Sequence, residues 1–598
     1  MDIINCFLYS MDNNVKNKTD YIDNFKLPIE LIEEKKELND TILNDLELKE
    51  FKRDISENTE ENLYYSVLNP ENVFEKMICN RWSNYYTSDK KFLVDTQNLL
   101  RNYKNNVSFK DEIDTEENTY NKCEEIFYDN GFTEKYQYID LPYFDKYNNN
   151  EFCMQALSIY NLISPLLNLL LPIIFLILPF FIIKLQGYEV TLESYINHLR
   201  TLFSQHIIGQ IFFDFSEASI STKIYLMASL GFYLFQIYQN IYSCQKFYTN
   251  IKYIHEILFT VKEYINNSIN SFNNLLNYTK SYITYENFNA TLEHNKTILT
   301  NYLYNLNKIK KYEFNFKKVF ELGHLMKCFY KLHNDDNVIN SLYFSFGCNG
   351  YIKNILTIQK QIKYNNINFC SFIKDDTKTQ FKNSYYGELV RDLSNTIVKN
   401  SYSLDNNLVL TGPNAAGKTT LLKATIFNII LCQQIGCGFF DDAKVKIYDF
   451  IHCYINVPDT SSRDSLFQAE ARRCKDILSI IEDNLDKMHL CVFDELYSGT
   501  NPEEAIASAY SYLTYLNNNK NVNYILTTHY YKLCKKLDKN VSKNYHMYIE
   551  KDISNNDFKF TYKIKKGISK IKGGLKVLKD LEYPEMIIKT IDNIRDKI

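Results

Sequence analysis

Thirteen consecutive residues, Leu408–Thr420 (LVLTGPNAAGKTT), carry the pattern of a loop that binds phosphate. The apolar run Leu408–Leu410 has strand character and leads into a turn that fits G-x-x-x-x-G-K-[ST]. Glycines let backbone N–H groups curl around phosphate oxygens, and the N-terminus of the following helix adds partial positive charge. We expect these residues to bind ATP: Gly412, Pro413, Asn414, Ala415, Ala416, Gly417, Lys418, Thr419 and Thr420.

Two metal ligands and a catalytic carboxylate follow from the same chemistry. Lys418 would place a positive charge beside the β and γ phosphates, and the Thr419 hydroxyl can ligate Mg²⁺. Leu490–Glu495 (LCVFDE) reads as a buried strand that ends in two acids. Ligands bind at the carboxyl ends of strands in open α/β sheets. We therefore expect Asp494 to hold Mg²⁺, usually through water, and Glu495 to polarise the attacking water.

A third strand-like run, Tyr524–His529 (YILTTH), ends in a histidine. A lone histidine after a strand is more often structural. Here the run follows the strand that carries the two acids, and this order favours a role for His529 as a sensor of the γ-phosphate.

The blocks around these residues resemble the ATPase domain of the MutS family of DNA mismatch-repair proteins. The blocks are TGPNAAGKTT (411–420), DSLFQAE (464–470), FDELYSGTNPEEA (493–505) and TTHYYKL (527–533). The resemblance implies a homo- or heterodimer in which Ser465 opens a helix and reaches the γ-phosphate of the neighbouring subunit. It also implies a last helix, 584–598, for dimer contact. Ser498 departs from the family, which usually has Arg at this position.

The composition indicates several domains, and it argues against a zinc site or a set of disulfides. The 598 residues exceed the size of a single core, and a hydrophobic content of 45% supports real cores. The 14 cysteines form no C-x-x-C pair and the 10 histidines show no ligand spacing. This pattern argues against zinc and disulfides and favours a reducing compartment.

Charge is distributed unevenly along the chain. Residues 1–150 hold 31 acidic and 18 basic residues, a net charge of −13, and the remainder holds 41 and 50, a net charge of +9. A polyanion such as DNA would be attracted to the C-terminal part and repelled by the N-terminal part. The triplet Phe132–Glu134 matches the Phe-x-Glu with which mismatch-repair MutS proteins wedge into DNA. The chain has 40 Phe, so such a match also arises by chance.

Residues 157–183 carry no charge and are long enough to span a bilayer. Pro165, Pro172 and Pro179 would each cost a soluble helix roughly 3 kcal/mol, whereas transmembrane helices tolerate proline better. A second apolar run, 224–242, would complete a transmembrane hairpin that leaves the ATPase domain facing the cytosol. The alternative is a buried core helix in a protein that is soluble in the cytoplasm or nucleus.

The expected fold is an α/β P-loop ATPase domain, ABC-like and of MutS type, preceded by an all-α lever region and a transmembrane hairpin. The expected regions are an acidic one (1–150), the hairpin (151–244), the lever (245–365) and the ATPase domain (366–598). The resemblance implies that ATP binding and hydrolysis at a dimer interface are coupled to binding of mismatched or branched DNA. The alternative is a membrane-anchored ATPase without mismatch recognition. An ABC transporter subunit fits less well, because the chain contains no L-S-G-G-Q.

Overall fold

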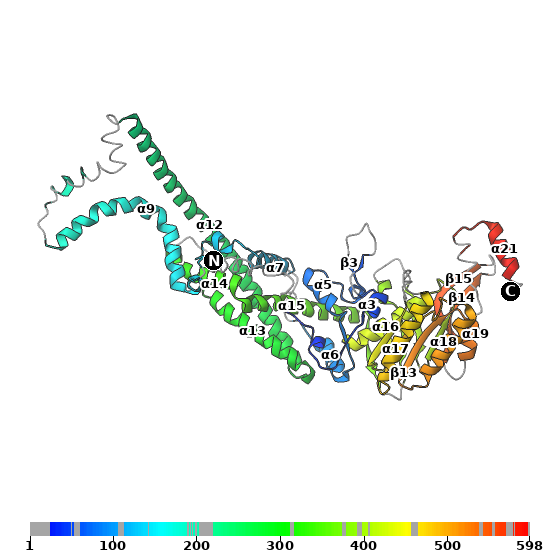
Figure 1. Cartoon of the computed structure of the whole chain (residues 1–598). Coiled ribbons are helices and arrows are strands. Elements are labelled where there is room, and N and C mark those ends of the chain that lie inside the picture. Colours follow the sequence, from blue (N-terminus) through cyan, green and yellow to red (C-terminus); the bar gives the residue numbers. More distant parts are fainter. Residues whose placement is uncertain are drawn as a thin grey trace. The chain divides into compact units, whose positions relative to one another are not determined.

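The computed structural model divides the chain into two compact units (Figure 1). One unit holds the described residues of 23–108, 270–294 and 344–598, and the other holds those of 109–269 and 295–343. Residues 1–23 and 202–218, which belong to the predicted acidic region and hairpin, lie outside the described residues, as does Asp464. The structure describes residues 24–48, 51–52, 60–105, 113–141, 143–187, 191, 193, 195–197, 200–201, 219–310, 316–373, 378–390, 397–404, 407–455, 465–537, 542–552, 557–569, 578 and 581–595.

The C-terminal part of the first unit is built on a six-stranded sheet with the order β11-β12-β13-β8-β14-β15. The first five strands run parallel, and β15 pairs antiparallel with β14. The carboxyl ends of β12, β13 and β8 therefore meet at one edge of the sheet. The strands are β8 (Asn407–Thr411), β11 (Phe450–Tyr454), β12 (His489–Asp494), β13 (Val522–Thr528), β14 (Ser542–Asp552) and β15 (Asp557–Lys566).

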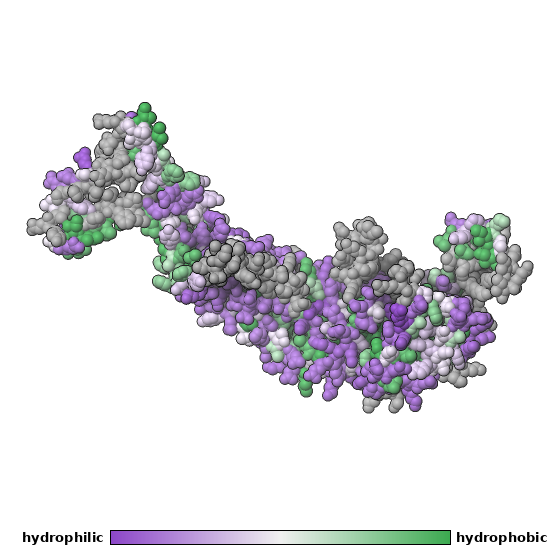
Figure 2. Space-filling view, viewed as in Figure 1, coloured by the Kyte–Doolittle hydropathy of each residue, from purple (hydrophilic) through white to green (hydrophobic). Residues whose placement is uncertain are grey.

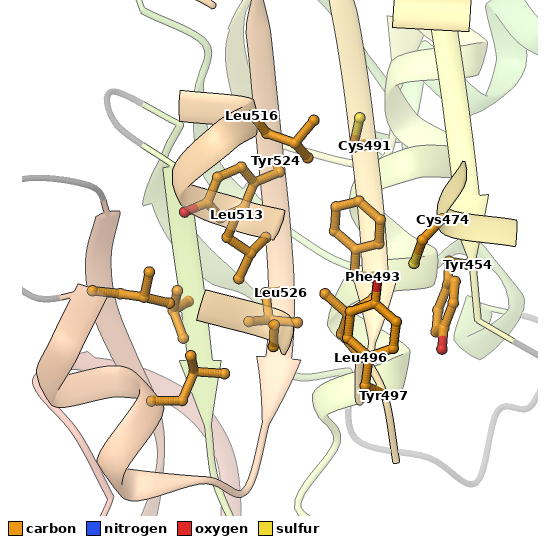
Figure 3. Close-up of a cluster of buried hydrophobic side chains, with 14 of the residues drawn as sticks. Tyr454, Cys474, Cys491, Phe493, Leu496, Tyr497, Leu513, Leu516, Tyr524 and Leu526 are labelled. Atoms are coloured by element: carbon orange, nitrogen blue, oxygen red, sulfur yellow. The ribbon is translucent and has the colours of Figure 1, made fainter. Parts of the chain in front are cut away.

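Helices cover both faces of this sheet. Side chains alternate between the faces of a strand, so Cys491 and Phe493 of β12 face one way and Leu490 and Val492 the other. On the first face, Phe493 joins a buried cluster with side chains from three helices (Figure 3). These helices are α17 (Leu466–Asp483), α18 (Pro502–Asn517) and α19 (Tyr531–Leu537). Helix α16 (Lys418–Ile435) packs against β12 and β13.

The N-terminal segment of this unit packs onto α16. The Tyr64 hydroxyl donates to Gln434 Oε1 (2.9 Å), and Gln97 Nε2 donates to the Gly436 carbonyl (2.7 Å). These bonds satisfy polar groups that are buried. Most residues of α16 are buried, so protein encloses this helix on almost every side. The segment comprises η1 (Pro28–Glu30), β1 (Lys35–Glu37), α3 (Asp40–Asp45), β2 (Phe51–Lys52), β3 (Glu60–Glu61), α4 (Tyr65–Leu68), α5 (Val73–Arg81), β4 (Tyr85–Thr87) and α6 (Lys90–Asn102).

A smaller sheet with the order β7-β6-β10-β5-β9 completes the first unit. Its strand β7 precedes β8 directly, so the small sheet leads the chain into the P-loop. Its strands are β5 (Asn368–Phe372), β6 (Gln380–Ser384), β7 (Asn400–Ser403), β9 (Cys437–Gly438) and β10 (Asp442–Val445), with η5 (Gly387–Val390) after β6.

The second unit is helical in its described residues, and the prediction of a helical region before the ATPase domain is confirmed. Phe132 is 1% exposed, and its ring stacks on Tyr138 and His333 at centroid distances of 5.2 and 3.9 Å. The helices here and at the join with the first unit are α7 (Ile113–Phe127), α8 (Phe132–Lys135), η2 (Asp145–Asn149), α9 (Glu151–Leu185), α12 (Ile220–Thr279), η3 (Ile283–Tyr285), α13 (Glu286–Leu306), η4 (Phe316–Glu321), α14 (Leu322–Asn334) and α15 (Asp336–Lys363).

The predicted transmembrane hairpin and membrane location are wrong. Within the described residues, none of the helices combines the length and apolar character that crossing a membrane needs. The predicted spans lie in α9 and α12, where polar side chains interrupt the apolar ones. Asn161 and Ser164 interrupt the run in α9, and Gln236 and Asn240 that in α12. A continuous apolar stretch of about 20 residues is what a span requires.

Candidate active site

The P-loop leaves the buried strand β8 and ends at the first residue of α16. Gly417 caps that helix in the left-handed region, with φ at +91°, where a side chain is strained. A Cβ on Gly417 would lie 3.1 Å from Cδ1 of Tyr562, and one on Gly412 would lie 3.0 Å from Cβ of Met547. Gly417 therefore requires glycine, and a side chain at Gly412 would have to displace the Met547 side chain by a few tenths of an ångström. The first N–H groups of an α-helix have no partner within the helix and suit phosphate, and here the first turn of α16 follows the loop directly.

Lys418 begins α16 and is only 6% exposed. Its Nζ donates to the Gly412 carbonyl at 3.0 Å and to the Pro413 carbonyl at 3.3 Å. The same Nζ lies 3.6 Å from Oε1 of Glu495. The ammonium group is thus held over the loop, next to the Glu495 carboxylate that follows β12.

Asp494 lies at the carboxyl end of β12, between two hydroxyl groups. Thr419 Oγ1 donates to Asp494 Oδ2 at 2.6 Å, and the Thr527 hydroxyl donates to Oδ1. Carboxylate and hydroxyl oxygens are hard ligands of the kind that Mg²⁺ prefers, and Mg²⁺ commonly takes one or two carboxylates plus substrate phosphates. Thr419 and Asp494 therefore fit a magnesium ion. Among the described residues no cluster of three or more His, Cys, Asp or Glu forms another metal site.

Glu495 has a backbone conformation that a residue with a side chain rarely adopts. Its φ is +53°, and its N–H donates to the Thr527 carbonyl (3.1 Å) and hydroxyl (3.3 Å). Such conformations persist when the surroundings impose them, and they cluster at active sites. The carboxylate Oε1 lies 3.7 Å from Nδ1 of His529. His529, and after it Lys418, lower the pKa of Glu495 and keep it ionised.

Glu470 connects α17 to the loop that follows Glu495. The Glu470 side chain is 2% exposed. It accepts the Ser498 N–H (3.0 Å), the Ser498 hydroxyl (2.9 Å) and the Gly499 N–H (3.1 Å). Ser498, the residue that departs from the family pattern, thus serves as a hydrogen-bond donor in this loop.

Ser465 is the N-cap of α17. Its side chain accepts the Gln468 N–H in a capping box, and the residue is exposed. The structure does not bring it to the P-loop of its own chain, because it is absent from the lining of the cavity above that loop.

A cavity of about 1,200 Å³ lies above the P-loop, with room for a nucleotide. Eight predicted site residues line it: Asn414, Ala415, Gly417, Lys418, Thr419, Thr420, Asp494 and Glu495. Gly412, Pro413 and Ala416 are buried, and His529 contacts Glu495.

Sequence reasoning missed several residues of the cavity wall. Tyr562 approaches Gly417, and Tyr386 comes from the chain before the P-loop. Arg473 belongs to α17 and Asp45 to the N-terminal helix α3. Tyr562 lies in β15 and opens the spacing Y-x-x-x-x-G that ends at Gly567. This spacing resembles the C-terminal tail of the MutS family, and it is the signal that could have found Tyr562.

Comparison with known proteins agrees with this geometry. Residues 408–598 match the family model of MutS domain V. This region is a MutS-type ATPase domain. The chain is 33% identical over 213 residues to the DNA mismatch repair protein MSH3 of Debaryomyces hansenii, which is 33% of this chain and 20% of that protein.

Two bacterial relatives are also similar to part of the chain. The chain is 38% identical over 128 residues to Endonuclease MutS2 of Acetivibrio thermocellus (21% of this chain, 16% of that protein). It is 27% identical over 223 residues to the DNA mismatch repair protein MutS of Persephonella marina (36% and 25%). The matches thus span a quarter or less of the length of these relatives.

Proposed function

We propose that the chain is a Mg²⁺-dependent ATPase whose reaction takes place in the cavity above the P-loop. One observation carries this proposal. Lys418, Glu495 and His529 come from three separate elements and lie in contact. The Thr419–Asp494 pair lies beside them at the edge of the same sheet. This is the set of charges and oxygens that phosphoryl transfer to water needs.

Each residue then has a defined task. The N–H groups of the P-loop and Lys418 bind the phosphates, and Thr419 and Asp494 hold the ion. When bound, Mg²⁺ would neutralise the charge that develops on the phosphate oxygens. Glu495 accepts a hydrogen bond from the attacking water and orients it. The left-handed backbone at Glu495, tied to Thr527, fixes the direction of the carboxylate.

Two variants test the assignment of the ATPase site. Glu495→Gln keeps the shape of the side chain and removes its basicity, so we expect ATP binding with hydrolysis slower by at least roughly 100-fold. Lys418→Ala removes the charge beside the phosphates, so we expect ATP binding itself to fail. Glu482→Gln and Lys520→Ala, on exposed positions of the same domain, are the matched controls. Hydrolysis by Glu495→Gln at the wild-type rate would refute the role of Glu495.

The site is proposed to be completed by a second subunit. Ser465 is exposed at a helix N-terminus and lies outside the cavity of its own chain. The C-terminal helix α21 (Glu585–Arg595) leaves apolar side chains exposed: Met586 is 82% exposed, and Figure 2 shows the hydrophobic colour on this helix. Exposed apolar surface of this kind marks interaction sites. A second copy in a head-to-tail dimer would supply Ser465 to the cavity.

Mixing two inactive variants tests this arrangement. A dimer of one Lys418→Ala subunit and one Ser465→Ala subunit contains one site with both residues intact. Random mixing should therefore restore about a quarter of the wild-type hydrolysis rate. If the mixture is no more active than the two variants alone, Ser465 does not act across the interface.

The ATPase is proposed to be coupled to DNA, since two of the relatives are named as DNA mismatch repair proteins. The form of DNA is a separate matter. Phe132, the wedge candidate, is stacked inside the helical unit and cannot reach a duplex without breaking that cluster. This observation favours a second candidate function, in which the ATPase works without mismatch recognition.

Stimulation of ATP hydrolysis by three DNAs separates the two functions. The DNAs are a matched duplex, a duplex with one mismatch and a four-way junction, each at several salt concentrations because phosphate contacts depend on salt. Preference for the mismatch would support the first function. Equal stimulation by the matched and mismatched duplexes, or none, would support the second.

A further inference from the structure

The N-terminal helix α3 forms part of the wall of the ATP cavity, although about 370 residues separate it from the P-loop in the sequence. Asp40, Thr41, Asn44 and Asp45 line the cavity together with the P-loop. Helix α3 packs against β11 of the six-stranded sheet. Its N-terminus is capped by Asn39, which accepts the Ile42 N–H at 3.0 Å.

Two ion pairs attach this segment to the two helices that carry site residues. Arg473 Nη2 of α17 donates to Asp45 Oδ2 at 3.0 Å, and the Asp45 side chain is 3% exposed. Lys423 Nζ of α16 lies 3.1 Å from Oε1 of Glu47. One short stretch of chain thus connects the helix that follows the P-loop to the helix that Ser465 caps.

Asp45 also contacts the chain on both sides of Ser465. Its Oδ2 accepts the N–H of Ile455, the residue after β11, at 3.2 Å. The guanidinium of Arg473 donates in turn to the Cys453 carbonyl at 2.7 Å. This buried carboxylate accepts from both a backbone N–H and an arginine, so replacing it with Asn keeps one oxygen acceptor but weakens both charge-assisted bonds.

We infer that α3 is a positioning element that links the state of the ATP cavity to the presentation of Ser465. Closure of the P-loop on phosphate displaces α16, and Glu47 and Asp45 transmit this displacement to α17. Asp45 and Arg473 are the positioning residues. The inference rests on the proposed ATPase function with Ser465 acting on a neighbouring subunit, and it adds the N-terminal segment to the machinery.

The test compares turnover with nucleotide affinity in the full-length protein. In Asp45→Asn we expect kcat to fall on the order of tenfold while the Kd for a fluorescent ATP analogue stays within about twofold. Arg473→Gln should also lower kcat, and the effects of the two changes should be less than additive in the double variant, because both changes remove the Asp45–Arg473 pair. Glu30→Gln is the matched control, since Glu30 forms a buried pair with Arg81 in the same N-terminal segment, 3.0 Å apart.

The outcomes separate the inference from the proposed function. A wild-type protein without ATPase activity would refute the proposed function itself. An active wild type with unchanged or raised kcat in Asp45→Asn would overturn the inference, and so would an equal fall of kcat in Glu30→Gln. If Asp45→Asn does not fold, Glu47→Gln at the less buried end of the segment serves instead. An unchanged kcat in that variant would also overturn the inference.

Discussion

Glu470→Gln should loosen the loop that holds Glu495 in place. The carboxylate accepts three hydrogen bonds from Ser498 and Gly499. Gln keeps one carbonyl oxygen, which can still accept from Ser498. Its NH₂ group, however, would face the Gly499 N–H, and two donors form no hydrogen bond with each other. One charge-assisted bond is lost, and such a bond contributes about 1.5–3 kcal/mol. Ser498 and Gly499 are exposed, so water compensates in part, and we expect about 2 kcal/mol.

Hydrogen exchange measures this change where it occurs. A loss of about 2 kcal/mol in the free energy of local opening speeds exchange of the Gly499 amide by roughly 30-fold, since 1.4 kcal/mol corresponds to a factor of ten. Mass spectrometry of a peptide that covers this loop resolves such a difference. Glu482→Gln, on the exposed face of the same helix, should leave the exchange of this peptide unchanged. Unchanged exchange in Glu470→Gln would refute the reasoning that Glu470 holds the loop.

Three further outcomes are expected. Gly417→Ala should weaken ATP binding in a fluorescence titration, because φ of +91° disfavours a side chain and Tyr562 lies 3.1 Å from the new Cβ. In His529→Ala the pKa of Glu495 should rise towards its ordinary value, because His529 is the main cause of its lowering. The acidic limb of the kcat profile should then move to higher pH. Asp494→Asn should raise the Mg²⁺ concentration needed for half-maximal hydrolysis, and EDTA should abolish hydrolysis.

The residues that the sequence predicted well lie close together in the chain and follow local rules. The P-loop signature needs only a strand, a turn with glycine and a helix start, and these occur between Asn407 and Ile435. The acids at the end of β12 follow from a buried strand that ends in charge. Local patterns of this kind predict the elements and the edge of the sheet at which they meet.

Contacts between distant parts of the chain carry no such pattern. Asp45 and Arg473 are 428 positions apart, and each has an ordinary neighbourhood in the sequence. The left-handed backbone of Glu495 is imposed by Thr527 on the neighbouring strand, so no property of Glu495 itself indicates it. The transmembrane prediction gave more weight to the absence of charge and to the three prolines than to the polar residues of the run, such as Asn161 and Ser164, and it is wrong.

Contacts between distant parts of the chain also change what the charge of the N-terminal region implies. A net charge of −13 over residues 1–150 treats every acid as free to repel a polyanion. In the structure Asp45 and Glu47 are paired with Arg473 and Lys423, which belong to the MutS-type ATPase domain. Each pair cancels its charge locally, so Asp45 can line a cavity for a triphosphate with little repulsion. Net charge therefore predicts long-range attraction or repulsion by a region, whereas the pairing of individual acids decides whether they can stand beside a phosphate.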